Sequence, residues 1–237
     1  SEKMKDKVAY ITGGTKGIGF GIALVLLKHG IKVAVSGRKQ EDAEEAARIL
    51  SDDDTKVFGI ASDVKNFEDQ KTAVSEIVKK FGRLDYVIAN AGLGIFNPVD
   101  EMSLEDWNDM IDTNLTGVFH TMKASIDELK KSEGYFISIA SLAGTNFFEK
   151  GSGYNASKFG VVGFTQAAMI DLRKYNIKVS TIMPGSVSTY FNGNEPSDED
   201  SWKIQPEDLG ELVVDIFKMN PRALPSKIEI RPSKPTS

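Results

Sequence analysis

Short apolar runs alternate with longer amphipathic stretches along nearly the whole chain. Each apolar run is short enough for a buried strand, and each longer stretch has the spacing of a helix. Regular alternation of strands with helices predicts an α/β fold with a doubly wound, mostly parallel, seven-stranded sheet and helices on both faces. We expect strands at 8–11, 31–35, 56–60, 84–89, 135–140, 178–183 and 227–230, and helices at 17–29, 40–50, 66–81, 103–131, 154–174 and 206–219.

The bulk composition narrows the functional classes. No linker or repeat divides the 237 residues, so we expect a single domain over 1–237. The absence of cysteine excludes disulfides, thiolate metal sites and cysteine nucleophiles, and the two histidines make no metal set. A net charge of −5 argues against nucleic acid and anionic membranes as partners. No apolar run is long enough to span a membrane and the charged start lacks a signal-peptide core, so we expect a cytoplasmic protein.

A glycine-rich turn joins the first strand to the first helix, in the sequence Thr-Gly-Gly-Thr-Lys-Gly-Ile-Gly. Backbone N–H groups and the helix dipole make such a turn an anion site. The spacing of Gly13, Gly17 and Gly19 differs from the common G-x-G-x-x-G pattern, and Lys16 is misplaced for a P-loop. We expect Gly13 to make the tight turn, Gly17 to admit a pyrophosphate and Gly19 to pack helix on strand. The alternative is a glycine turn without a ligand.

The second strand ends in Ser36, Gly37 and Arg38. Dinucleotide folds that bind NAD carry an acidic residue near this place for the ribose 2′-hydroxyl. An arginine there suits a 2′-phosphate instead, and Lys16 can approach the same group. Two charge-assisted hydrogen bonds of about 1.5–3 kcal/mol each suffice for a strong NADP preference. The alternative is an exposed arginine in a loop.

Two further strand ends carry candidate cofactor contacts. Asp63 follows the third strand and can accept a hydrogen bond from an adenine amino group; it can also cap the next helix, although Asn66 is better placed for that. Asn90, Ala91 and Gly92 follow the fourth strand, where small residues let the backbone approach a cofactor closely.

Ser141, Tyr154 and Lys158 form the candidate catalytic set. Tyr154 and Lys158 are four residues apart and share one helix face. A lysine charge there lowers the tyrosine pKa, which suits Tyr154 to act as a general acid toward a carbonyl oxygen. Ser141 ends the fifth strand and can hydrogen-bond the same oxygen. The alternative is a serine in a turn and a solvated Tyr–Lys pair.

Asn114 lies among apolar residues in the middle of the helix predicted at 103–131. A polar side chain in that setting needs a partner. It either holds a water that relays protons toward Lys158 or is a locally satisfied buried amide. His29 and His120 are interpreted as structural.

The substrate is expected at the carboxyl edge of the strands, under an acidic lid at about 190–204. Several apolar side chains there favour an apolar or aromatic carbonyl compound; the alternative is that they pack the lid against the body. Ser141, Phe147, Tyr154 and Tyr190 are the predicted substrate contacts, and 231–237 is expected to be a frayed tail. The candidate wall comprises Leu93, Ile95, Phe96, Phe147, Phe148, Tyr190, Phe191 and Trp202.

In order and spacing, these motifs resemble the short-chain dehydrogenase/reductase family along nearly the whole chain. The resemblance implies a Rossmann fold with strand order 3-2-1-4-5-6-7. It also implies a tetrad in which Tyr154 transfers the proton, Ser141 positions the carbonyl, Lys158 binds the nicotinamide ribose and Asn114 holds a relay water. Gly37, Arg38 and Lys16 resemble the NADP-preferring branch. The motifs are Thr12–Gly19, Asn90–Gly92, Asn114, Ser141, Tyr154–Lys158 and Pro184–Thr189, and the further implied cofactor contacts are Thr15, Ile18, Val64, Pro184, Gly185, Val187 and Thr189.

The expected function is therefore NADPH-dependent reduction of a ketone or aldehyde to an alcohol. The chain ends in IEIRPSKPTS, a tail similar to that of sepiapterin-reductase-like members and different from that of 3-oxoacyl-acyl-carrier-protein reductases. The acidic lid would also repel an acidic carrier protein. Reduction of a 3-oxoacyl thioester stays as an alternative, and a non-catalytic NADP(H)-binding regulatory module is a remote one. The long helices at 103–131 and 154–174 suit a self-complementary face, so we expect a homodimer or homotetramer.

Overall fold

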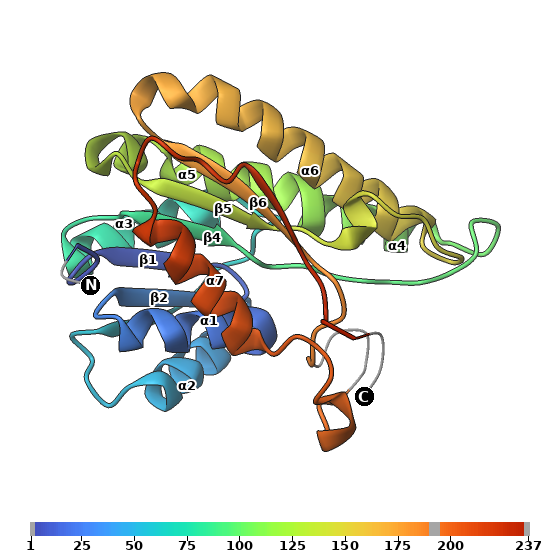
Figure 1. Ribbon diagram of the computed structural model, residues 1–237, viewed down its shortest axis with the longest axis horizontal. Helices are drawn as coiled ribbons and strands as arrows, with labels where there is room; N and C mark the ends of the chain where they lie inside the picture. The colour runs from blue at the N-terminus through green and yellow to red at the C-terminus, as the bar shows by residue number, and fades with distance from the viewer. Residues whose placement is uncertain (1–2, 190–194, 235–237) are drawn as a thin grey trace.

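The computed structural model describes residues 3–189 and 195–234 and contains one seven-stranded sheet (Figure 1). All strand pairs are parallel and the order is β3-β2-β1-β4-β5-β6-β7, which confirms the order that the resemblance implied. The strands are β1 (Val8–Ile11), β2 (Lys32–Gly37), β3 (Val57–Ala61), β4 (Tyr86–Ala89), β5 (Tyr135–Ile139), β6 (Lys178–Pro184) and β7 (Lys227–Ile230).

Helices cover both faces of the sheet, as Figure 1 shows. The layer of α1, α2 and α7 packs on one face, and the layer of α3 to α6 packs on the other. Predicted and observed bounds agree within two residues, with one exception described below. The helices are α1 (Gly17–Lys28), α2 (Gln40–Leu50), α3 (Phe67–Phe81), α4 (Leu104–Ile111), α5 (Gly117–Ser132), α6 (Ser152–Leu172) and α7 (Pro206–Lys218).

The exception is the predicted helix 103–131. A π-helical turn, Asp112–Thr116, separates α4 from α5. A π turn holds one residue more than an α turn and is most often found at functional sites. Here it contains Asn114, which is fully buried.

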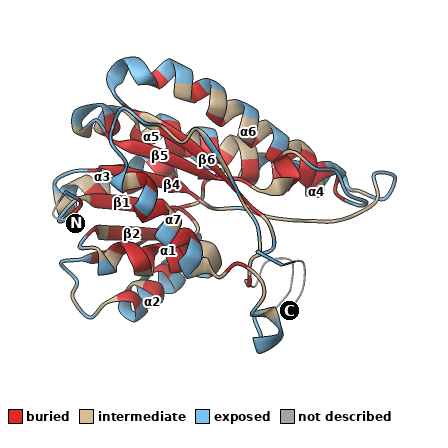
Figure 2. Cartoon of the chain, in the orientation of Figure 1, coloured by how far each residue is buried: buried red, intermediate tan, exposed pale blue. Residues whose placement is uncertain are grey.

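The central strands form the core. β1, β4 and β5 are buried along their whole length, as the red strands in Figure 2 show. Such double burial explains why these strands are continuous apolar runs without alternation. No helix in the described ranges is long and apolar enough to cross a membrane.

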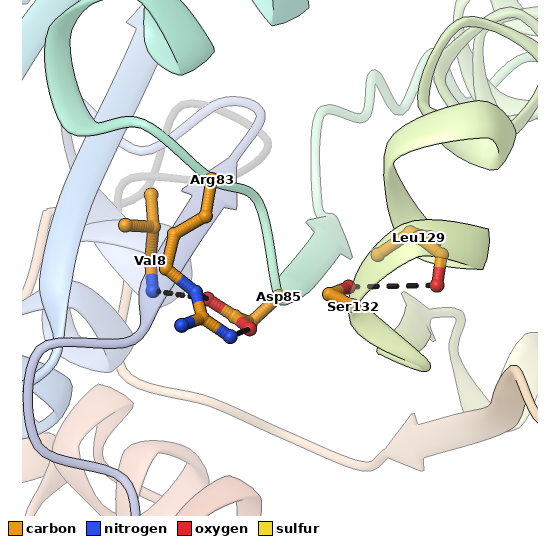
Figure 3. A network of polar contacts seen from close by, with 5 residues as sticks. All are labelled: Val8, Arg83, Asp85, Leu129 and Ser132. Atoms are coloured by element: carbon orange, nitrogen blue, oxygen red, sulfur yellow. Dashed lines mark hydrogen bonds and ion pairs between the residues drawn. The ribbon is translucent and has the colours of Figure 1, made fainter.

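A buried carboxylate joins the strands at the edge where they begin (Figure 3). The Asp85 carboxylate accepts two hydrogen bonds from Arg83, at 2.8 and 2.6 Å, and one from the Val8 backbone N–H at 2.9 Å. The Asp85 side chain is 2% exposed, whereas that of Arg83 is 50% exposed. This network fixes the end of the sheet opposite the strand tips that the motifs occupy.

Candidate active site

A cleft of about 1790 Å³ runs along the carboxyl edge of the strands. Nearly all the predicted site residues line it, although they lie as far apart in the sequence as Gly13 and Thr189. Gly19 and Asn114 lie behind its wall, and Tyr190 is outside the described residues. The predicted residues that line it are Gly13, Thr15, Lys16, Gly17, Ile18, Gly37, Arg38, Asp63, Val64, Asn90, Ala91, Gly92, Ser141, Phe147, Tyr154, Lys158, Pro184, Gly185, Val187 and Thr189.

The glycine turn has the geometry of a phosphate cradle. Gly13 has φ +61°, and a Cβ there would lie 2.8 Å from the Ala91 Cα, so only glycine fits. Gly17 has φ +59°, and within the described residues the atoms near its Cβ position belong to Thr189, at 3.8 Å. A Cβ on Gly19 would lie 2.6 Å from the Gly13 carbonyl oxygen. Gly17 thus has open space beside the start of α1, while Gly19 serves packing.

Cations gather at the neighbouring tip of β2. Lys16, Arg38 and Lys39 all line the cleft there. A Cβ on Gly37 would lie 2.8 Å from the Thr15 Cγ2, so an acidic side chain at position 37 would clash. The donor set therefore suits a phosphate and not a bare ribose hydroxyl. Sequence reasoning missed Lys39, although its position directly after Arg38 was a usable signal.

The loop after β3 is anchored from behind at three consecutive residues. Gln70 donates a 2.6 Å hydrogen bond to Ser62, the Asp69 carboxylate accepts one from the Asp63 backbone at 3.1 Å, and the His120 ring bonds the Val64 carbonyl at 2.7 Å. His120 is thus structural, as predicted.

The same loop settles which residue caps α3. The Asn66 side chain accepts a hydrogen bond from the Asp69 backbone at 3.2 Å and caps the helix, as predicted. The Asp63 side chain accepts from the Lys65 backbone at 3.0 Å. Asp63 nevertheless lines the cleft, where its carboxylate is available to a ligand.

Ser141, Tyr154 and Lys158 come together in the middle of the cleft. Tyr154 and Lys158 lie one turn apart on α6, and the Lys158 Nζ is 5.7 Å from the centre of the Tyr154 ring. Ser141 follows β5 and accepts a hydrogen bond from the Ala143 backbone at 3.1 Å, which fixes its side chain. Its hydroxyl also hydrogen-bonds the Tyr154 phenol.

Burial dominates the ionisation of this set. It raises the pKa of Tyr154 above its ordinary value, an effect that the hydrogen bond from Ser141 only partly offsets. Burial also lowers the pKa of Lys158 to about 8. The prediction that the Tyr154 pKa lies below its ordinary value is therefore wrong, because burial of the phenol outweighs the hydrogen bond that lowers the pKa.

Asn114 clamps the loop that follows β4. Its amide donates to the Leu93 carbonyl at 2.7 Å and to the Ser157 hydroxyl at 3.0 Å, and its side-chain oxygen accepts from the Leu93 backbone at 2.7 Å. Both amide hydrogens are thus in use. The side chain is thus a locally satisfied buried amide, which is one of the two alternatives for this residue, and the relay water stays a prediction.

Aromatic side chains surround Tyr154. The Phe96 and Phe148 rings lie 5.3 and 6.4 Å from the Tyr154 ring, and Ile95 and Phe96 pack beside it. Leu93, Phe147, Phe148 and Trp202 of the predicted wall line the cleft, whereas Tyr190 and Phe191 lie outside the described residues.

The end of the chain departs from the predicted frayed tail. Arg231 to Lys234 line the cleft, although Arg231, Ser233 and Lys234 are exposed, and 235–237 lie outside the described part of the chain. The main-chain bond between Gly185 and Ile230 holds the start of this segment in place.

Comparisons with known proteins agree with this geometry. The profile of the short chain dehydrogenase family matches residues 7–200. An uncharacterised oxidoreductase of Staphylococcus aureus (strain MW2) is 33% identical over 231 residues, which cover 97% of this chain and 98% of the relative.

Two solved structures share nearly the whole fold. An alcohol dehydrogenase from the archaeon Thermococcus sibiricus, complexed with 5-hydroxy-NADP, is 30% identical with a TM-score of 0.89, over 98% of this chain and 99% of that one. A 3-ketoacyl-(acyl-carrier-protein) reductase from Brucella melitensis, complexed with NADH, is 25% identical with a TM-score of 0.86, over 97% and 98%. The chain belongs to the short chain dehydrogenase family and is an oxidoreductase.

Proposed function

We propose that this protein reduces a ketone or aldehyde to an alcohol at the expense of NADPH, with Tyr154 as the general acid. The observation that carries the proposal is the meeting of Tyr154, Ser141 and Lys158 in a cleft that begins at the open glycine turn. When bound, the nicotinamide supplies a hydride to the carbonyl carbon and is oxidised.

The tip of β2 supports NADP(H) as the cofactor. Arg38, Lys16 and Lys39 would hold the 2′-phosphate, and Gly17 would admit the pyrophosphate. The Thermococcus relative contains an NADP derivative, in agreement with this assignment, whereas the Brucella relative contains NADH. The cations of this chain, and not the fold, therefore argue for the phosphate.

Each catalytic side chain has one task. Tyr154 gives its proton to the carbonyl oxygen, and its raised pKa keeps that proton in place at neutral pH, which suits reduction. Ser141 donates a hydrogen bond to the same oxygen. Lys158 would bind the nicotinamide ribose, and Asn114 positions the loop at Leu93.

The surroundings complete the proposal. Residues 195–204 act as a lid over the apolar wall, and the rest of the predicted lid, 190–194, lies outside the described residues. Copies of the chain assemble as a dimer or tetramer, and the enzyme works in the cytoplasm. Within the described residues no cluster of acidic residues and histidines could hold a metal ion, and no step assigned here needs one.

The test compares Tyr154→Phe with Tyr175→Phe. Tyr175 lies on the surface and packs against Lys130, so its replacement controls for the loss of a phenol elsewhere. Turnover is followed by NADPH and NADH absorbance against diketones, aromatic aldehydes and an acetoacetyl thioester. We expect Tyr154→Phe to lower kcat at least about 100-fold with an unchanged Kd for NADPH, because only the proton donor is lost.

The possible results separate the candidate functions. Full activity in Tyr154→Phe would remove that residue from the mechanism. Turnover of the thioester in preference to small carbonyls would favour the acyl-thioester reductase, a function that the Brucella relative's name keeps in view. Tight NADPH binding without oxidation of any carbonyl would favour a regulatory protein.

A further inference from the structure

The segment that follows β7 forms part of the cleft wall. β7 pairs with β6 so that Ile230 lies opposite Pro184, and the Gly185 N–H donates to the Ile230 carbonyl at 2.8 Å. The chain leaving β7 therefore runs beside the turn after β6. Arg231, Pro232, Ser233 and Lys234 all line the cleft.

This segment belongs to the half of the cleft that contains the catalytic tyrosine. A Cβ placed on Gly185 would lie 3.3 Å from the Leu142 side chain and 3.5 Å from the Pro232 ring. Leu142 directly follows Ser141, whereas the proposed phosphate-binding cations follow β2. Because β2 and β6 are separated by β1, β4 and β5, the two cationic groups are far apart across the sheet.

The charges in this half of the cleft leave Arg231 as the cation best able to bind a ligand. Lys203 already pairs with Asp200 at 3.1 Å, with both side chains mostly buried. Arg231 pairs with Glu229 at 3.6 Å, and these side chains are 58% and 46% exposed. A pair so exposed contributes little to stability. A ligand carboxylate that accepts two parallel hydrogen bonds from the guanidinium can replace Glu229, because little binding energy is lost when the exposed pair separates.

Besides Lys158, which is proposed to bind the nicotinamide ribose, Lys234 and Asp109 are charged residues of the cleft wall. Lys234 adds a second positive charge to the segment that carries Arg231, and Asp109 contributes one negative charge from α4. Arg231 and Lys234, with one exposed internal partner, therefore border a wall that includes the apolar side chains of Leu142, Phe147 and Phe148. In a protein of net charge −5, this edge favours an anionic group on the substrate.

We propose that the substrate is an oxo acid, with Arg231 binding its carboxylate and Lys234 strengthening the local positive potential. The inference rests on the proposed carbonyl reduction. The reaction balances as oxo acid, NADPH and a proton giving hydroxy acid and NADP⁺: the carbonyl carbon gains hydride and its oxygen gains the Tyr154 proton. The carboxylate does not react; it orients the carbonyl beneath the aromatic wall.

The experiment uses substrate pairs that differ only in charge: benzoylformate against methyl benzoylformate, and acetoacetate against methyl acetoacetate. Wild type is compared with Arg231→Gln and with Arg222→Gln, a matched loss of charge at an exposed residue that does not line the cleft. We expect Arg231→Gln to raise KM for an acid about tenfold and KM for its ester by less than twofold, with an unchanged Kd for NADPH. Arg222→Gln should change none of these values.

A binding measurement supplies a second readout. In the Tyr154→Phe background, where turnover is removed, calorimetry with NADPH present should show tighter binding of benzoylformate than of its ester, and Arg231→Gln should abolish the difference. Equal effects on acid and ester, or a wild-type enzyme that prefers the esters, would overturn the inference while leaving carbonyl reduction intact. A rise in the NADPH Kd with an unchanged acid-to-ester ratio would assign Arg231 to the cofactor instead. Absence of turnover with every carbonyl would overturn both proposals.

Discussion

Lys158 is an ionisable side chain that the fold buries, with 5% of its surface exposed. Burial lowers its pKa from 10.5 to about 8, so between these two pH values the unfolded chain binds more protons than the folded one. Stability therefore rises with pH across this window, and below it the folded protein bears the full cost of the buried charge. We predict that Lys158→Met abolishes turnover yet raises the free energy of unfolding at pH 7 by about 3 kcal/mol. Urea denaturation followed by circular dichroism measures this change.

The pH dependence makes this prediction specific. The advantage of Lys158→Met over wild type should shrink above pH 8 and vanish only above pH 10.5, where the lysine becomes neutral in both states. Lys123→Met, at an exposed site on α5, should show no such trend. A Lys158→Met protein that is less stable at pH 7 would mean that contacts of the ammonium group outweigh its desolvation.

Arg38 is the side chain on which the proposed cofactor preference depends most. Arg38→Gln should raise KM for NADPH about 10- to 100-fold, since a charge-assisted hydrogen bond contributes about 1.5–3 kcal/mol, and should leave KM for NADH unchanged. Gly37 is left intact because a larger residue would clash with Thr15. Arg48→Gln is the control, because Arg48 lies on α2, the helix that follows Arg38 in the chain, and does not line the cleft. An unchanged ratio of the two KM values would move the phosphate contact to Lys16 or Lys39.

Elements whose ends are set by neighbouring residues in the sequence could be predicted, whereas features that depend on contacts between distant segments could not. Asn66 caps α3 and Pro206 begins α7, as their side chains alone indicate. The π turn around Asn114 could not be predicted from its own residues, because the groups that hydrogen-bond the Asn114 side chain belong to Leu93 and Ser157, which are distant in the sequence. Likewise the raised pKa of Tyr154 comes from the packing around it and not from its spacing to Lys158.

Asp85, directly before β4, hydrogen-bonds residues of β1 and β5, so we expect its replacement to affect stability and not activity. Besides its side-chain bonds, its backbone pairs with Val8 of β1 and Tyr135 of β5. Asp85→Ala should lower the free energy of unfolding by about 3 kcal/mol, since it leaves the Val8 N–H without its carboxylate partner and opens a buried space. Thermal and urea unfolding measure the change, while KM should stay constant because the site lies at the other edge of the sheet. Glu68→Gln removes one partner of an exposed pair with Lys71 and should change the free energy of unfolding by less than about 0.5 kcal/mol. If Glu68→Gln destabilised the protein as much as Asp85→Ala does, the Asp85 network would have no special effect on stability.

The two edges of the sheet have different roles: one contributes to stability and the other contains the functional cleft. The Asp85 network fixes the edge where strands begin, and the cleft lies at the opposite edge, where the segments that follow the seven strands converge. The order of the motifs along the chain sufficed to predict this convergence, because parallel strands bring all their carboxyl ends to one edge. The tail escaped prediction because its place in the cleft depends on the pairing of β7 with β6, which no short motif encodes.

The outer surface of the α4–α6 layer carries the apolar residues expected of a subunit interface. Leu104 and Trp107 on α4, Phe119 on α5 and Ile170 on α6 are 40–83% exposed. Burying them between two copies would supply the apolar core that stable dimers have.

We predict a mass in solution of about twice, or for a tetramer four times, 25.9 kDa by light scattering. Phe119→Glu should reduce it toward 25.9 kDa by placing a charge in the interface. Ile49→Glu, which charges an exposed apolar site on α2 in the opposite layer, should leave the mass unchanged. A wild-type monomer would contradict the interface, and dissociation by Ile49→Glu alone would move it to the other face of the sheet.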